Sequence, residues 1–336
     1  MGLFQSQRAR LLGLLTGVLL LTGVMLLSIL LGLQNFHISM LLHTYQAFDG
    51  STEHMIIRDT RVPRTIVGAV VGAGLAVAGA VMQAITRNPL ASPSVFGINS
   101  GAVLFIVIGI TVLGGGLSMS GMIWLAFAGA AVTALLVFVL GFSGPGGFAP
   151  VKLTLAGSAI AAFSASVTSG IILIDKQSLD QALFWMVGSV VNRNMEHVMA
   201  MLPYAAAGLV LALLLSRSLN VAALGDEVSK GLGISLFLVR AGACISVVLL
   251  AGSGVAVAGP IAFIGMIVPH LCRSLVGQDH RWLIPYCAVA GSLLLVLADL
   301  VSRFVIMPKE VPVGVATALI GVPFLIYIVR RKSYVL

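Results

Sequence analysis

Three arginines at a spacing of three residues, Arg58, Arg61 and Arg64, are the side chains of this sequence that most clearly suggest chemistry. A guanidinium group is a planar fork of donors that pairs bidentately with carboxylates. The cluster therefore suits the docking of an acidic partner protein. A generic anchor at a membrane interface is the alternative explanation of the same residues.

A second candidate is the segment 218–237, with the sequence SLNVAALGDEVSKGLGISLF. Its apolar residues recur at helical spacing, and Asp226 and Glu227 fall in a predicted first helical turn, where acids suit the helix dipole. A surface loop does not need a patterned apolar face, whereas a docked partner buries one. An amphipathic helix lying on the membrane is the alternative.

A third stretch, QAITRNPLASPSVFGINSGA at 83–102, interrupts apolar sequence with polar residues and two prolines. Asn88 followed by Pro89 favours a turn. Ser92 followed by Pro93 is typical of the N-cap and first residue of a helix. The sequence therefore predicts a short polar stop between two helices.

The sequence lacks the motifs of several catalytic sites. It contains no G-x-x-x-x-G-K-[ST], no H-E-x-x-H and no G-x-S-x-G, so we expect neither ATP binding by a P-loop nor an enzyme. We expect no metal or other cofactor. Three outer histidines are expected to be solvated, and three cysteines to be packing residues: His37, His43, His54, Cys244, Cys272 and Cys287.

The elements that must position these residues are membrane helices. The chain has 336 residues, of which 59% are hydrophobic and 9% charged, a composition of a polytopic membrane protein. Apolar runs of about 20 residues without period-2 alternation predict helices, so we expect an all-α fold forming one transmembrane domain over 1–336. Ten spans are predicted: 11–33, 65–84, 93–113, 121–141, 153–174, 197–216, 238–256, 258–275, 283–303 and 312–329.

The distribution of charge predicts the orientation. With the N-terminus inside, the inner segments hold 12 basic residues and three acids, and the outer segments hold seven basic residues and eight acids. The positive-inside rule then places both termini in the cytoplasm. The excess of basic charge is thus a signal of topology, and we expect no nucleic-acid partner. An outer interfacial helix is expected at 175–196, and Trp124, Trp185 and Trp282 are expected to be interfacial anchors.

Several stretches together resemble one family, the FecCD-type permeases of ATP-driven importers for ferric siderophores, haem and cobalamin. They are RVPRTIVGAVVGAGLAVAGAVMQAITRNPLASPSVFGINSGA (61–102), QALFWMVGS (181–189), LGDEVSKGLGI (224–234), the long run from VAVAGP to LADLVSR (255–303) and EVPVGVATALIGVPFLIYIVRR (310–331). The resemblance covers nearly the whole chain beyond residue 55 and keeps the order and spacing of the family's motifs.

The resemblance implies a fold of ten helices with both termini inside. It implies a channel made by two permease subunits, the same chain or a paralogous one, with helices five and ten near their interface. It also implies two ATP-binding-cassette ATPase subunits and an extracytoplasmic binding protein, all assembled at the cytoplasmic membrane.

The resemblance also assigns roles to residues of this chain. Docking of the binding protein falls to Arg61, Arg64 and Arg303, with Arg58 beside them. Coupling to the ATPase falls to the segment 218–237: Leu224, Gly225, Asp226, Glu227, Lys230, Gly231 and Gly233. The loop with Asn88, Pro89 and Leu90 resembles the inner gate. The companion gate would be the Gly/Pro-rich loop 141–152, which departs from the Ser/Thr-containing version expected of a cobalamin permease.

We therefore expect a non-catalytic channel subunit that moves ferric siderophore, with haem or cobalamin as alternative cargo. An ion-coupled secondary transporter is the rival of a different class. It would depend on an ionisable group in the bundle, for which Asp299 and His270 are the candidates. We also expect Asp299 to pair with Arg303 four residues later on one helix, and His270 to make a structural polar contact. An enzyme acting on lipids would need a nucleophile, a metal or paired acids, for which the sequence shows no pattern.

Overall fold

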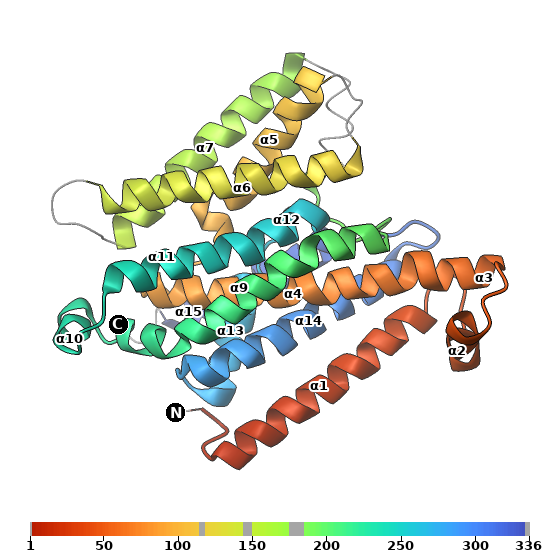
Figure 1. Ribbon diagram of the computed structural model, residues 1–336, viewed down its shortest axis with the longest axis horizontal. Helices are drawn as coiled ribbons and strands as arrows, with labels where there is room; N and C mark the ends of the chain where they lie inside the picture. Colours follow the sequence, from red (N-terminus) through yellow and green to blue (C-terminus); the bar gives the residue numbers. More distant parts are fainter. Residues whose placement is uncertain (1, 114–117, 144–149, 175–184, 333–336) are drawn as a thin grey trace.

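The computed structural model describes residues 2–113, 118–143, 150–174 and 185–332, and these fold as a bundle of helices (Figure 1). The long elements are α1 (Gln7–Leu30), α4 (Val62–Thr86), α5 (Ile98–Leu113), α6 (Met119–Phe142), α7 (Pro150–Ile174), α9 (Met195–Ala222), α11 (Leu236–Val247) continued by α12 (Ser253–Ala258), α13 (Ile264–Val276), α14 (His280–Val305) and α15 (Val313–Lys332). Each predicted span overlaps one of these helices or the α11–α12 pair, so the predicted fold class is confirmed.

The described helices differ in length. Seven are long and apolar enough to cross a membrane, and α5, α13 and α15 are shorter apolar helices. Helix α13 begins at Ile264, so the prediction that this span starts at 258 is wrong. The reason is local, because Gly259 and Phe263 have φ values of 71° and 70°, which a continuous right-handed helix cannot contain.

Helix α4 lies at the centre of the bundle. It is buried over almost its whole length and packs against α14, α9, α13 and α11. Glycines allow the closest of these contacts, because small residues let helix backbones approach. A Cβ atom on Gly72 would lie 2.3 Å from the carbonyl oxygen of Gly291 in α14, and one on Gly79 would lie 1.8 Å from that of Gly265 in α13.

Short elements cap the two ends of the bundle. At one end lie α2 (Ile38–Gln46), α3 (Thr52–Met55) and a π-helical turn (Ile56–Arg61) that runs directly into α4. At the other end lies α10 (Asp226–Gly231), together with both chain termini (Figure 1). The charge distribution makes the α10 end the inner face, and the termini share it as predicted.

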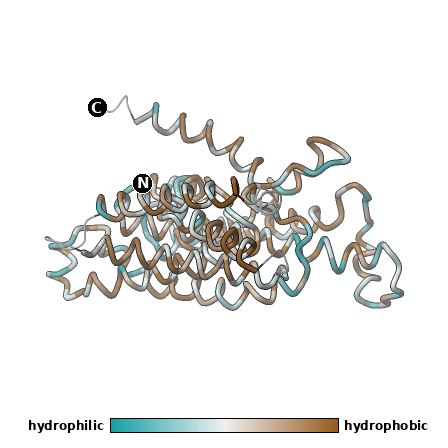
Figure 2. The backbone as a smooth tube through the Cα atoms, turned by 90° about the horizontal axis from the view of Figure 1, so that it is seen from above, coloured by the Kyte–Doolittle hydropathy of each residue, from teal (hydrophilic) through white to brown (hydrophobic). Residues whose placement is uncertain are grey.

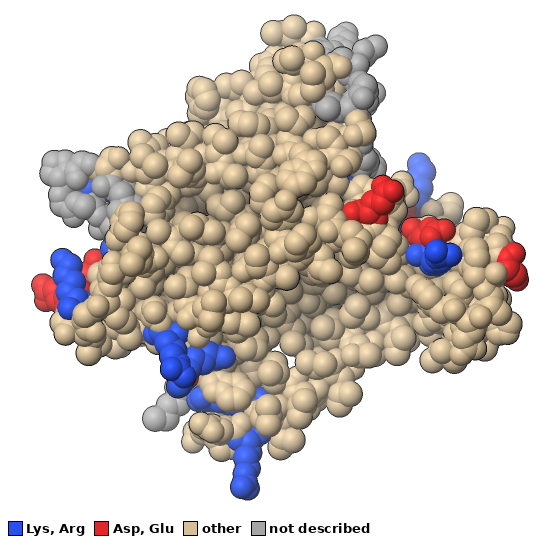
Figure 3. Space-filling model, in the orientation of Figure 1, with Lys and Arg blue, Asp and Glu red and all other residues tan. Residues whose placement is uncertain are grey.

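The surface shows the two ends clearly. In Figure 3 the charged side chains gather at the ends of the molecule, and the belt between them is free of charge in this view. Figure 2 shows the C-terminal helix α15 leaving the rest of the bundle at an angle. Its Leu319 is 70% exposed and its Ile320 50% exposed, so α15 keeps a wide apolar face uncovered.

The aromatic anchors agree with expectation only in part. Trp124 is 50% exposed near the outer end of α6, as an interfacial anchor should be. Trp185 is only 6% exposed and packs within the core, so its predicted role at the interface is wrong. Residues 175–184 of the predicted interfacial helix lie outside the described residues. The described remainder of that segment is mostly irregular up to Met195, where α9 begins.

Candidate functional site

Three of the four arginines expected at the outer face come together in space. Arg61 ends the π-helical turn, Arg64 lies in the first turn of α4, and Arg303 lies in the last turn of α14. They share the wall of an outer cavity of about 310 Å³, which Glu310 also lines. All three are at least 93% buried, so the cavity exposes only a small part of each guanidinium group.

Asp299 is the centre of this outer cluster. Its carboxylate accepts a hydrogen bond from Arg64 Nη2 at 2.8 Å and one from Arg303 Nη2 at 2.6 Å. The side chain of Asp299 is 4% exposed. Arg64 also donates from Nη1 to Glu310 Oε2 at 2.6 Å, and the Glu310 side chain is 24% exposed. The predicted pairing of Asp299 with Arg303 is therefore confirmed, and Arg64 joins it from 235 residues away.

The remaining donors of the cluster cap helix α1. Arg61 Nη1 donates to the carbonyl oxygens of Ile29 at 2.8 Å and Leu30 at 3.0 Å. Arg303 Nη1 donates to the carbonyl oxygens of Ser28 at 2.7 Å and Leu31 at 3.2 Å. The last carbonyl groups of a helix lack partners within it, and cations are favourable at that end. The cluster thus fastens α1 to α4 and α14, a structural role that the sequence analysis missed.

Arg58 lies apart from these three arginines. It is exposed, and its guanidinium group lies 4.9 Å from the centre of the Phe48 ring. Phe48 stacks on His54 with ring centres 5.9 Å apart. His54 is 2% exposed and lies 2.8 Å from Asp49, so the expectation of a solvated histidine is wrong for this residue. Of the four predicted docking arginines, only Arg58 presents its side chain freely at the outer surface.

At the inner face, Asp226 holds two arginines from different elements. Arg87, just after α4, donates from Nη2 to Asp226 Oδ1 at 2.5 Å and to the carbonyl oxygen of Ala222 at 2.9 Å. Arg240, in α11, donates to both carboxylate oxygens at 2.8 and 2.9 Å. Burial acts to raise the pKa of Asp226, but the hydrogen bonds and charges of Arg240 and Arg87 outweigh it. The pKa therefore lies below its ordinary value of 3.8.

The opposite face of α10 is open. Asp226 and Glu227 occupy the first helical turn, as predicted. Ser229 is fully buried and donates to the carbonyl oxygens of Val221 and Gly225, which seats α10 on the end of α9. Three apolar residues here are open to solvent: Leu224 is 68% exposed, Val228 47% and Leu232 62%. The charged residues Glu227 and Lys230 are exposed beside them.

The predicted coupling set therefore divides in two. Asp226 faces the bundle, whereas Leu224, Glu227 and Lys230 face away from it. The three glycines, Gly225, Gly231 and Gly233, stand at open positions where a Cβ atom would meet nothing. Gly225 and Gly233 have φ values of 126° and 74°, so they supply the backbone turns at the two ends of α10.

The predicted gate loop joins α4 to the inner network. Arg87 adopts a left-handed conformation with φ 51°, which ends α4. The Asn88 side chain accepts a hydrogen bond from the backbone N–H of Leu90 at 3.0 Å, which makes the turn that Asn88-Pro89 predicts. Asn88, Pro89 and Leu90 are all exposed. Most of the expected companion gate, residues 144–149, lies outside the described residues.

A buried amide links the same loop to α13. Gln83 Nε2 donates to the carbonyl oxygens of Ala91 and Gly265, each at 3.3 Å. The carbonyl of Gly265 needs this donor because Pro269, four residues later, has no N–H to offer it. Arg273 of α13 donates to the Gln83 oxygen. No local sequence pattern indicates a role for Gln83, because its partners lie 8 to 190 positions away.

The described residues bear on two other kinds of site, a metal site and the ionisable groups of an ion-coupled transporter. Among the described residues, no group of three or more His, Cys, Asp or Glu side chains could hold a metal ion. His270 lies edge-on to the Phe324 ring, with centres 6.0 Å apart. Asp299 is already paired with two arginines. The two groups that an ion-coupled transporter would need are therefore both engaged in contacts within the fold.

Comparison with known proteins gives a consistent result. The family model described as the FecCD transport family matches residues 19–331. The chain is 50% identical over 289 residues to the Probable siderophore transport system permease protein YfiZ of Bacillus subtilis, covering 86% of each. It is 42% identical over 317 residues to the Ferric enterobactin transport system permease protein FepD of Escherichia coli, covering 94% of each.

A solved structure also matches. It is described as an inward-facing conformation of a metal-chelate type ABC transporter, and its TM-score is 0.84 at 28% sequence identity. The match covers 95% of this chain and 98% of that one.

Proposed function

The chain belongs to the FecCD transport family, and from that premise we propose that it is the channel subunit through which an ATP-driven importer moves ferric siderophore across the cytoplasmic membrane. The observation that carries the proposal is the match over residues 19–331 together with relatives named for iron complexes. The bundle itself is a multi-pass membrane protein of the permease class. We treat residues 1–336 as one permease domain.

The proposed importer has three kinds of protein subunit besides the lipid bilayer. A binding protein delivers the chelate at the outer face, two permease chains form the channel, and two ATPase subunits bind at the inner face. The uncovered apolar faces of α7 and α15 support a second permease subunit, since Phe163 is 66% and Leu319 70% exposed. Hydrolysis of ATP on the partner chains would rock the permeases between outward- and inward-facing states.

Docking of the binding protein is proposed at the outer cavity. Glu310 already offers Arg64 a carboxylate there, at 2.6 Å. A carboxylate of the binding protein could take the place of Glu310 without changing the chemistry of the pair. Arg58, which is exposed beside this end of the bundle, would meet a second acid on the partner. Arg61 and Arg303 then act as supports of the cavity.

Coupling is proposed at the inner face. The open side of α10, with Leu224, Val228 and Leu232, suits an apolar groove on the ATPase. The closed side, with Asp226, would carry the movement of α10 to Arg87 and so to the gate loop at Asn88 and Leu90. Arg240 of α11 pairs with the same aspartate, so a movement of α10 would also reach α11.

The test of the function is uptake by a deletion strain and by the same strain complemented with this chain. The panel contains labelled ferric hydroxamates, ferric catecholates, haem and cobalamin, with and without the partner ATPase. Loss of one iron chelate alone, restored by complementation, is the expected result. Loss of haem or cobalamin uptake instead would mean that this compound, and not ferric siderophore, is the cargo. Uptake that persists without the ATPase would contradict the proposal of an ATP-driven importer.

A further inference from the structure

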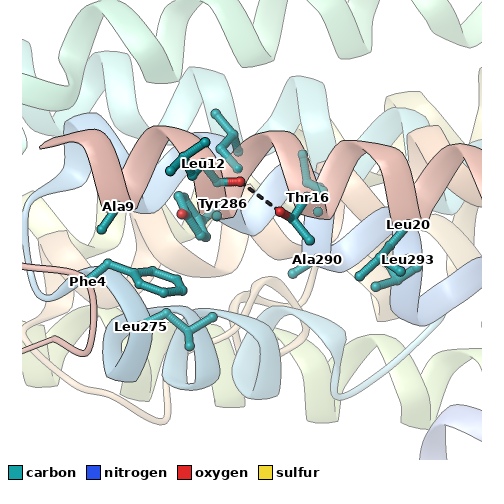
Figure 4. A pocket seen from close by; sticks show the side chains of 13 residues that line it. Phe4, Ala9, Leu12, Thr16, Leu20, Leu275, Tyr286, Ala290 and Leu293 are labelled. Atoms are coloured by element: carbon teal, nitrogen blue, oxygen red, sulfur yellow. Dashed lines mark hydrogen bonds between the residues drawn. The ribbon is translucent and has the colours of Figure 1, made fainter. Parts of the chain in front are cut away.

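An apolar groove runs between α1 and α14 on the outside of the bundle. Figure 4 shows its two walls, with Ala9, Leu12, Thr16 and Leu20 on one side and Ala290 and Leu293 on the other. Its volume is about 550 Å³. The groove exists because α1 is attached chiefly to α14 and leaves Leu12, Leu19 and Leu20 more than half exposed.

The polar groups in the groove are satisfied internally. The Thr16 hydroxyl donates to the carbonyl oxygen of Leu12 at 2.9 Å, and the Tyr286 hydroxyl donates to that of Arg10 at 2.5 Å. The walls therefore offer an occupant almost no hydrogen bonds. Such a surface suits a hydrocarbon chain, because burying apolar area is the main gain available there.

The groove extends over one leaflet only. It reaches from Ala9 to Leu20 of α1, which is about 16 Å at the rise of an α-helix. This is roughly half of the hydrocarbon thickness of a bilayer, about 30 Å. The end at Ala9 is the inner one, because the N-terminus lies at the inner face with α10 (Figure 1). The groove thus has the length and position of an acyl chain of the inner leaflet.

The inner mouth of the groove is basic. Arg8 is exposed next to Ala9, and no carboxylate of the described residues forms an ion pair with it. Arg10 follows on the same helix and donates from Nε to the carbonyl oxygen of Phe4. Arg281 at the start of α14 is balanced by Asp279 at 2.7 Å. In Figure 3 basic side chains gather over the inner ends of α1 and α14.

From the groove and its mouth together, we propose that this is a binding site for an anionic glycerophospholipid of the inner leaflet. One acyl chain lies along Leu12, Thr16 and Ala290, and the phosphate lies at Arg8. Basic pockets at the cytoplasmic ends of membrane helices bind anionic headgroups in this way, with about 1 kcal/mol from each basic residue. The site requires only that the chain spans a membrane, so it stands apart from the cargo and from the coupling proposal.

The test is native mass spectrometry of the full chain, purified with its partner subunits and supplied with phosphatidylglycerol or with phosphatidylcholine of the same chain length. We expect preferential retention of phosphatidylglycerol. R8Q should reduce that retention about fivefold, as 1 kcal/mol implies. R217Q is the matched control, because Arg217 is another exposed arginine of the inner face but lies on α9, which contributes no residue to the groove. A290F should fill the groove and lower retention of both lipids, whereas V301F, at an exposed position of α14 outside the groove, should not.

Three results would overturn the proposal. Equal loss with R8Q and R217Q would mean that the lipid responds to general surface charge. Unchanged retention with A290F, in a complex of normal composition, would mean that no chain occupies the groove. A changed number of subunits with A290F would mean that the groove receives a protein helix. If A290F does not fold, the comparison of R8Q with R217Q still decides, because both positions are exposed.

Discussion

The molecule contains the same arrangement twice, at opposite faces, in two different settings. At the outer face Asp299 lies between Arg64 and Arg303, and at the inner face Asp226 lies between Arg87 and Arg240. The Asp299 side chain is 4% exposed and the Asp226 side chain 40% exposed. Because of this difference in exposure, we interpret the Asp299 cluster as stabilising the fold and the pair of Asp226 with Arg87 as one that can break and re-form.

The physical reason lies in the cost of desolvation. A buried ion pair that loses one partner leaves an uncompensated charge in a medium of low dielectric, at a cost of about 3–5 kcal/mol. An exposed pair that opens is solvated by water, and its contribution is about 0–1 kcal/mol. The outer cluster therefore holds α1, α4 and α14 in one arrangement. At the inner face, the pair of Arg87 and Asp226, with side chains 38% and 40% exposed, can open at little cost, whereas the Arg240 side chain is only 9% exposed.

The largest expected effect is on stability. D299N should lower the free energy of unfolding by about 3–5 kcal/mol, because Arg64 and Arg303 lose their shared carboxylate while remaining buried. The measurement is denaturation by SDS in mixed micelles. D59N is the control, since Asp59 is an exposed outer acid, and it should leave the curve unchanged. A curve for D299N that overlays the wild type would remove the distinction between the two faces.

The second effect is on assembly. L224D combined with V228D should weaken the association of the ATPase subunits at least tenfold, because both residues are exposed and apolar, Leu224 just before α10 and Val228 within it. Co-purification from detergent measures it. D226N, on the closed face, is the control and should leave association intact. Weaker association in D226N than in the double variant would mean that the two faces of α10 have been assigned the wrong way round.

The third effect is on transport without a loss of fold. R87Q removes one of the two cations from Asp226 and leaves Arg240 in place. The free energy of unfolding should fall by less than about 1 kcal/mol, since both side chains are more than a third exposed. Uptake should nevertheless drop several-fold, because α10 loses its link to the gate loop. A fall in stability as large as that of D299N would show that the inner pair is also a support.

The smallest effect concerns pH. The pKa of Asp226 lies below its ordinary value of 3.8, so the group is depressed in the folded state. Its contribution is therefore fully present above about pH 4 to 5 and is lost only as the pH falls through the folded pKa. Uptake in proteoliposomes should show no step due to Asp226 between pH 5.5 and 8. A step in this range that D226N abolishes would contradict this assignment of charge.

The sequence predicted the helices well and their contacts poorly. Among the described residues, hydropathy located the long helices, because length and apolar content decide which segments cross a bilayer, but it placed the start of α13 too early. Asp299 and Arg303 could be paired from their spacing of four on one helix. The third member, Arg64, is 235 residues from Asp299 in the sequence, and no local sequence pattern predicts a contact over such a separation. Trp185 was misplaced because a position near a helix end predicts an interface only when no other element covers it.

The same limit applied to the functional residues. The pattern of 218–237 indicated that α10 has an apolar face, but it grouped Asp226 with residues of the opposite side. The arginines Arg61, Arg64 and Arg303 were recognised as a set, whereas their burial and their role as caps of α1 depend on tertiary packing. Residue types thus indicated which groups matter, and only the fold showed which way each one faces.

The most direct test of the account is the amount of substrate moved per ATP hydrolysed, with the assembled importer in proteoliposomes and the variants D226N and E227Q. Glu227 is the matched control, because it is the adjacent acid of the same helical turn and faces away from the bundle. We expect D226N to hydrolyse ATP at close to the wild-type rate and to move at least tenfold less substrate per ATP, while E227Q keeps the wild-type ratio. A wild-type ratio in D226N would contradict the claim that the inner aspartate transmits the movement of α10 to the gate.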